Sequence, residues 1–170
     1  MCTTFASATL SKPGAHLQFP LNVTLEVIKL NKQYSIEYGE TLLDYAFDML
    51  MLRETCGVNH AEFIFVRTTE HLKEYPELKG WFIGKLKSTL ENNWLNVGAE
   101  TKRPNGYIPG ELVEYIAHTM KWKELKEIAL NELEKHKNNQ VYLMDRNLPS
   151  SILEALENDW EDIEFYPSLQ

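Results

Sequence analysis

The chain has 170 residues, of which 44% are hydrophobic and 25% are charged. This length is typical of one domain, and this composition excludes an intrinsically disordered protein. The formal net charge of −8 argues against direct binding to nucleic acid, because surfaces that bind phosphates are basic.

The N-terminal part of the chain predicts an irregular arm followed by a β-hairpin. Residues 1–20 show no clear hydrophobic period. Apolar and polar residues then alternate over 23–27 and again over 34–38, within strands expected at 23–30 and 33–38, and Asn31-Lys32 lies between the two segments. Because alternation with period two is typical of a half-buried strand, we expect two antiparallel strands joined by a short turn.

The next two segments predict a helix and a central strand. Thr41 can cap a helix over residues 41–56, in which apolar residues recur at steps of three and four. Residues 61–66 read Ala-Glu-Phe-Ile-Phe-Val, a short run rich in aromatic and β-branched residues that favours a buried strand. An order of strand, strand, helix and strand favours the α+β class.

The C-terminal half predicts further helices and two short strands. Apolar residues recur at helical spacing in four segments: 77–93, 111–120, 122–136 and 149–158. Strands are expected at 140–144 and 163–166. The expected fold is therefore α+β: a small, mostly antiparallel sheet of about four or five strands packed against about five helices, in a single domain over residues 21–170.

Sequence motifs for cofactors, metals and nucleophilic catalysis are missing. The eight glycines form neither a Rossmann loop nor a Walker loop. The chain contains no H-E-x-x-H, C-x-x-C or G-x-S-x-G. Cys56 and His60 lie four residues apart, but a single pair supplies two of the four ligands that zinc takes. We expect no cofactor and no metal, and the motifs identify no catalytic residue.

Negative charge is concentrated at the C-terminus. Residues 145–170 hold seven acidic residues and one basic residue, with aromatic residues among them. Carboxylates steer basic partners, and aromatic side chains anchor interfaces. We predict a partner-binding surface formed by Glu157, Asp159, Trp160, Glu161, Asp162 and Glu164. The same pattern is also typical of a solvated acidic face, and the aromatic side chains can equally face the core.

The loop over residues 95–109 is a second candidate site. It contains the turn Pro104-Asn105-Gly106, and long loops in compact domains are often functional. An anionic ligand or a partner peptide is expected to contact its polar and aromatic side chains: Lys102, Arg103, Asn105 and Tyr107. A solvated surface hairpin explains the same residues.

These observations favour a non-enzymatic interaction module, such as an adaptor, inhibitor or regulator. The alternative is a small enzyme or ligand-binding domain, with its site in the 95–109 loop or at Cys2. Removal of Met1 would place the Cys2 thiol beside a free α-amino group that can act as a base. Two cysteines are too few for a disulfide scaffold, and no apolar run reaches the ~18 residues that cross a bilayer. We therefore expect a soluble cytoplasmic protein with no membrane partner.

Overall fold

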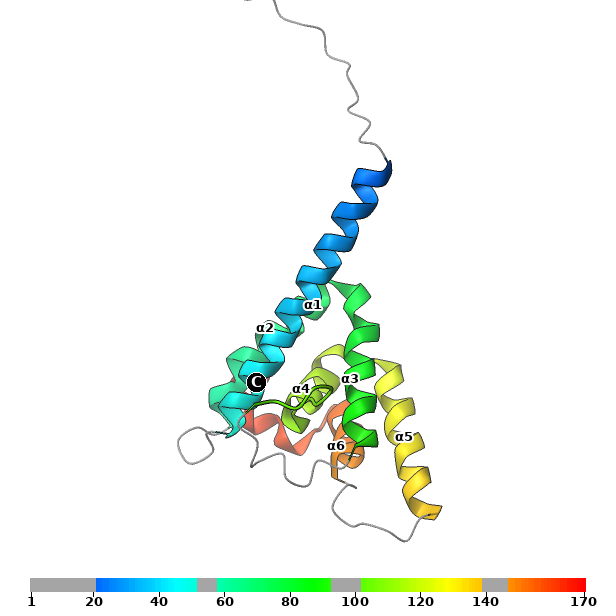
Figure 1. The fold of residues 1–170 in the computed structure, drawn as a ribbon. Helices are drawn as coiled ribbons and strands as arrows, with labels where there is room; N and C mark the ends of the chain where they lie inside the picture. The colour runs from blue at the N-terminus through cyan, green and yellow to red at the C-terminus, as the bar shows by residue number, and fades with distance from the viewer. Residues whose placement is uncertain (1–20, 52–57, 93–101, 139–146) are drawn as a thin grey trace, which may run out of the picture.

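In a computed structural model, residues 21–51, 58–92, 102–138 and 147–170 are described, and these ranges form a helical assembly without strands (Figure 1). The α-helices and 3-10 helices (η) occur in the following order: α1 Leu21–Met51, α2 Val58–Glu74, η1 Pro76–Leu78, α3 Lys79–Glu91, α4 Gly110–Met120, α5 Lys123–Asn138, α6 Asn147–Leu156, η3 Glu161–Phe165 and η4 Pro167–Leu169.

The predicted N-terminal hairpin is wrong, because residues 23–30 and 33–38 both belong to the long helix α1. Tyr34 and Tyr38 lie four residues apart and are both exposed, at 62% and 42% of their surface, whereas Ser35 between them is buried. Exposure at i and i+4 is the spacing of a helix face. Five residues of alternation were therefore too short a window to distinguish period two from period 3.6.

The predicted central strand at 61–66 is also wrong, since these residues lie in α2. Its buried positions follow steps of three and four: Ala61, Ile64, Phe65, Thr68 and Leu72. Phe63, on the opposite side of the helix, is 57% exposed. The segment 163–166 forms the end of η3 and the residue that follows it. The strand predicted at 140–144 and the arm predicted at 1–20 lie outside the described residues.

The four helices predicted in the second half of the chain are confirmed, with ends that differ by a few residues. They correspond to α3, α4, α5 and α6. Residues 41–51 of the helix predicted at 41–56 form the last third of α1, so Thr41 caps no N-terminus, and residues 52–56 lie outside the described residues. Its hydroxyl instead donates to the backbone oxygen of Glu37, one turn back in the same helix.

One hydrophobic core joins the described helices. The antiparallel pair α1 and α2 packs through α2 onto α4, and α6 packs against both α4 and α5. The side chains that fill this core are fully or almost fully buried, and they come from each of these helices and from α3: Leu43, Ala46, Phe65, Phe82, Leu86, Leu112, Ile116, Leu125 and Ile152. Burial of apolar side chains is the main stabilising contribution to such a fold.

Lys121 fixes the turn between α4 and α5. It ends α4 in the left-handed conformation, at φ 47°. Its ammonium group donates to the backbone oxygens of Leu156 and Glu157 at 2.7 and 2.8 Å, and these oxygens lie at the C-terminal end of α6. A cation at a helix C-terminus is favourable. Across the described residues, no helix combines the length and apolar character needed to cross a membrane.

Candidate functional site

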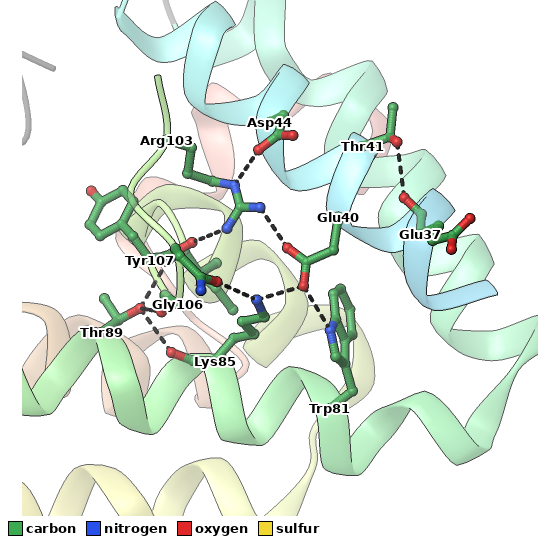
Figure 2. Close-up of polar contacts among 12 residues, drawn as sticks. Glu37, Glu40, Thr41, Asp44, Trp81, Lys85, Thr89, Arg103, Gly106 and Tyr107 are labelled. Carbon is green, nitrogen blue, oxygen red and sulfur yellow. Dashed lines mark hydrogen bonds and ion pairs between the residues drawn. The ribbon is translucent and has the colours of Figure 1, made fainter. Parts of the chain in front are cut away.

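Arg103, predicted to bind a ligand, lies at the centre of an internal ion-pair network (Figure 2). Its side chain is 5% exposed. Nη2 donates to Glu40 Oε2 at 2.6 Å, and Nε donates to Asp44 Oδ1 at 2.7 Å. Nη1 donates to the backbone oxygen of Tyr107 at 2.9 Å. The guanidinium therefore ties residues 103–107 to α1.

Glu40 receives two further donors, both from α3 (Figure 2). Lys85 forms an ion pair with Glu40 Oε1, and Trp81 Nε1 donates to the same oxygen at 3.1 Å. Burial acts to raise the pKa of Glu40, but the hydrogen bonds from its side-chain donors hold that pKa below its ordinary value. The network has two bases and two acids, so its formal charges balance.

The other predicted ligand residues lie in the same segment and have different environments. Lys102 is exposed. The Asn105 side-chain oxygen faces Lys85 Nζ at 3.4 Å, and the Tyr107 ring packs edge-on against Phe47 with centroids 6.0 Å apart. An anion bound by Arg103 would have to displace two carboxylates. The geometry thus gives Arg103 a role in holding α1 and the 103–107 turn together.

The predicted acidic surface is held rigidly at the C-terminus. Tyr166 is 2% exposed, and its ring packs near Phe65 and Tyr115. Ser168 donates from its backbone nitrogen and from its hydroxyl to Glu62 Oε1, at 2.8 and 2.6 Å. These contacts fasten the segment after α6 to α2 and α4, so its acidic side chains are positioned on the surface of the fold.

Within the predicted set, the acids and the aromatic residue have opposite environments. The carboxylates of the set belong to exposed residues: Glu157, Asp159, Glu161, Asp162 and Glu164. Trp160 is only 3% exposed. Its ring stacks on Tyr166 at 5.1 Å between centroids and lies 5.2 Å from the ring of His118. Trp160 therefore acts as a buried support, and the acids form the accessible surface.

The structure adds acidic residues that sequence reasoning missed. Glu154 lines an open hollow of about 300 Å³ together with Glu157, Asp159, Trp160 and Glu161. In α4, burial raises the pKa of Glu114 to about 7, and the negative charges of Glu111, Asp162 and Glu154 add to this effect. Glu111 and Glu114 lie three residues apart on a predicted helix, a spacing that places both on one face. Only the fold brings this face beside the C-terminal segment.

Basic residues do not neutralise the C-terminal acids through ion pairs in the described part of the chain. The acids that do form ion pairs with Lys or Arg there belong to other regions: Glu40, Asp44, Glu70, Glu124 and Glu132. Lys121 lies close to Glu157, but its ammonium group is bound to backbone oxygens of α6. The surface is therefore left with an excess of negative charge.

No group of three or more potential metal ligands occurs among His, Cys, Asp and Glu of the described residues. Cys2, Cys56 and residues 95–101 of the 95–109 loop lie outside those residues. Comparison of the chain with protein-family models, with curated proteins and with solved structures gave no match.

Proposed function

We propose that this protein is a non-catalytic interaction module that binds a basic protein partner through an acidic C-terminal surface. This surface consists of Glu154, Glu157, Asp159, Glu161, Asp162 and Glu164. The observation that supports the proposal most is that these exposed carboxylates are mounted on a segment that Trp160 and Tyr166 fasten into the core. A surface that is already ordered loses little conformational entropy on binding.

The negative charge of this surface supports the choice of a basic partner. These carboxylates form no ion pair with lysine or arginine among the described residues. Such a group attracts a positively charged surface, speeds encounter and disfavours acidic partners. Glu114 agrees with this argument: burial is the main cause of its raised pKa, and the negative charges of Glu111, Asp162 and Glu154, which a basic partner would offset, raise that pKa further. A cytoplasmic location, inferred from the small number of cysteines, forms part of the proposal.

The test is capture of partners by three tagged versions of the full chain from nuclease-treated native lysate. The versions are the unmodified chain, a variant with Glu157→Lys, Glu161→Lys and Asp162→Lys, and a control with Asp48→Lys, Glu77→Lys and Glu127→Lys. The control changes three exposed acids elsewhere and has the same net charge as the first variant. We expect one stoichiometric partner that salt releases, retained by the control and lost by the C-terminal variant.

Either of two results would count against the proposal. The first is equal capture of the partner by the C-terminal variant, provided that circular dichroism shows a helical fold with unchanged thermal unfolding. The second is loss of the partner from both variants, which would show a dependence on net charge alone. The alternative site at Arg103 is not favoured, because its guanidinium is bound within the fold.

A further inference from the structure

α1 extends beyond the end of α2 (Figure 1), and a second hollow lies between these two helices near that end. It is open to solvent, has a volume of about 380 Å³, and lies between one stretch of α1 and the last turn of α2. Seven residues line it: Asn31, Tyr34, Ser35, Tyr38, His71, Glu74 and Tyr75. Four of these seven side chains are aromatic or imidazole rings.

Three of the four rings contact one another, with His71 between Tyr38 and Tyr75. The His71 ring lies 4.9 Å from the Tyr38 ring in an edge-on arrangement, and 4.9 Å from the Tyr75 ring on another side. His71 is 5% exposed, and its Nε2 lies 2.7 Å from the backbone oxygen of Ser35, so it is fixed against α1. The arrangement gives the hollow an aromatic floor.

The rim of the hollow is aromatic and accessible. Tyr34 is 62% exposed and Tyr38 is 42% exposed. A helix surface usually presents polar side chains to water. Exposed tyrosine rings at the mouth of a hollow commonly contact a ligand or a protein partner. Tyr45 lies further along the same helix at 55% exposure but does not line the hollow.

The charge of the lining is negative. Glu74 is the carboxylate among the lining residues, and the lining includes neither lysine nor arginine. Arg67 of α2 lies outside the lining but forms a hydrogen bond with the Tyr38 side chain, and its guanidinium is paired with Glu70 Oε2 at 2.7 Å. The negative charge of Glu74 and its hydrogen bond to Tyr75 raise the pKa of the Tyr75 hydroxyl. Aromatic ring faces and a carboxylate together attract a cation and offer little to an anion.

We propose that this hollow binds the ammonium group of an organic cation. The group belongs either to a lysine side chain of a protein partner or to a free quaternary amine. Ring faces of tyrosine supply cation–π attraction, and Glu74 supplies a counter-charge. The inference is independent of the acidic C-terminal surface, because the two share no residue.

The experiment is a titration of the ¹⁵N-labelled full chain, followed by the backbone amide signals of residues 31–38 and 71–75. The probes are tetramethylammonium chloride, Nα-acetyl-lysine methylamide, and tert-butanol as a neutral molecule of similar size to tetramethylammonium. We expect saturable shifts with tetramethylammonium and none with tert-butanol. Saturable shifts with both cations identify a lysine side chain as the ligand, whereas shifts with tetramethylammonium alone identify a free quaternary amine.

Variants separate cation recognition from contact with any apolar surface. Tyr34→Leu and Glu74→Gln are each expected to weaken tetramethylammonium binding by about threefold or more, while Tyr34→Phe keeps the ring face and stays within about twofold. Tyr45→Leu, an exposed tyrosine on the same helix, is the matched control and leaves the affinity unchanged.

The proposal is overturned if neither cation gives saturable shifts at these amides, or if tert-butanol shifts them as strongly. It is also overturned if Tyr45→Leu weakens binding as much as Tyr34→Leu. The variant with Glu157→Lys, Glu161→Lys and Asp162→Lys retains this hollow, so loss of protein capture by that variant and loss of cation binding here are separate outcomes.

Discussion

Arg103 and Glu40, which are 63 residues apart in the chain, are joined by a hydrogen bond of 2.6 Å between the guanidinium and the carboxylate. Because Asp44 accepts from Nε and the Tyr107 backbone oxygen accepts from Nη1, this one side chain connects α1 to the turn before α4. A partly buried carboxylate that loses such a partner remains poorly solvated, which is strongly destabilising.

Arg103→Met should therefore lower the free energy of unfolding by about 3 kcal/mol, as measured by urea denaturation. Methionine keeps the apolar stem of the side chain but removes all its donors. Lys102→Met, at the exposed neighbouring residue, is the control and should change the free energy by less than about 0.5 kcal/mol. Equal effects at the two positions would contradict the role assigned to Arg103.

Gly39 is a tight contact point between α1 and α3. A Cβ atom at this position would lie 2.8 Å from Cη2 of Trp81. Gly39→Ala is therefore expected to destabilise the protein by about 1–3 kcal/mol, although alanine favours helix formation. Gly84→Ala in α3 is the matched control, because nothing lies within 4 Å of its Cβ position. There we expect stabilisation of up to about 1 kcal/mol, so thermal unfolding of the two variants should shift in opposite directions.

The raised pKa of Glu114 predicts a pH dependence of stability. Its pKa is about 7 in the folded protein, against 4.5 for an unperturbed glutamate. Between these values the folded protein holds a proton that the unfolded chain has lost, so the free energy of unfolding falls as pH rises toward 7. Stability from this group is fully present below pH 4.5.

Glu114→Gln should remove that dependence. At pH 8 the variant is expected to exceed the unmodified protein in free energy of unfolding by roughly 3 kcal/mol at most, and the difference should shrink as pH falls to 5. Urea denaturation at both pH values measures the two quantities, with the exposed Glu157→Gln as control. A constant difference between pH 5 and pH 8 would disagree with the environment described for Glu114.

The hydrogen bonds of Ser168 to Glu62 are expected to hold the acidic C-terminal segment against α2. Ser168→Ala removes the hydrogen bond of 2.6 Å from its hydroxyl to the buried carboxylate of Glu62. We expect a loss of about 1–2 kcal/mol and faster amide hydrogen exchange at Ile163, Tyr166 and Leu169, whose amides bond within this segment. Unchanged exchange at these three amides would mean that Ser168 does not fasten the segment.

Sequence patterns located the helices of the second half of the chain, but in the first half they assigned strands to segments of α1 and α2. Short runs such as Tyr34–Tyr38 and Ala61–Val66 match strand and helix templates equally well over five or six residues. Packing between residues distant in the chain decides between the two structures. At Gly39, for example, only a glycine leaves room for the Trp81 ring. Propensity for β-structure at 61–66 was overridden because the helical spacing buries Ala61, Ile64 and Phe65 on one face.

Sequence patterns alone were limited in the same way in predicting the environments of the candidate site residues. The exposed acids of the C-terminus followed from composition, since charged residues are rarely buried. Two other residues could not be placed in this way. Arg103 lies in a polar loop but is bound to α1, and Trp160 lies among acids but is buried. Partners from distant helices determine both positions, and a single sequence without that geometry does not identify them.

The measurement that tests the central claim most directly is the dissociation constant of the captured partner for the purified protein, at two salt concentrations. We predict that raising the salt weakens binding to the unmodified chain, as expected for contacts between exposed charges. The variant with Glu157→Lys, Glu161→Lys and Asp162→Lys should bind at least about tenfold more weakly. An affinity that neither salt nor these three substitutions change would contradict the assignment of the acidic C-terminal surface as the docking site.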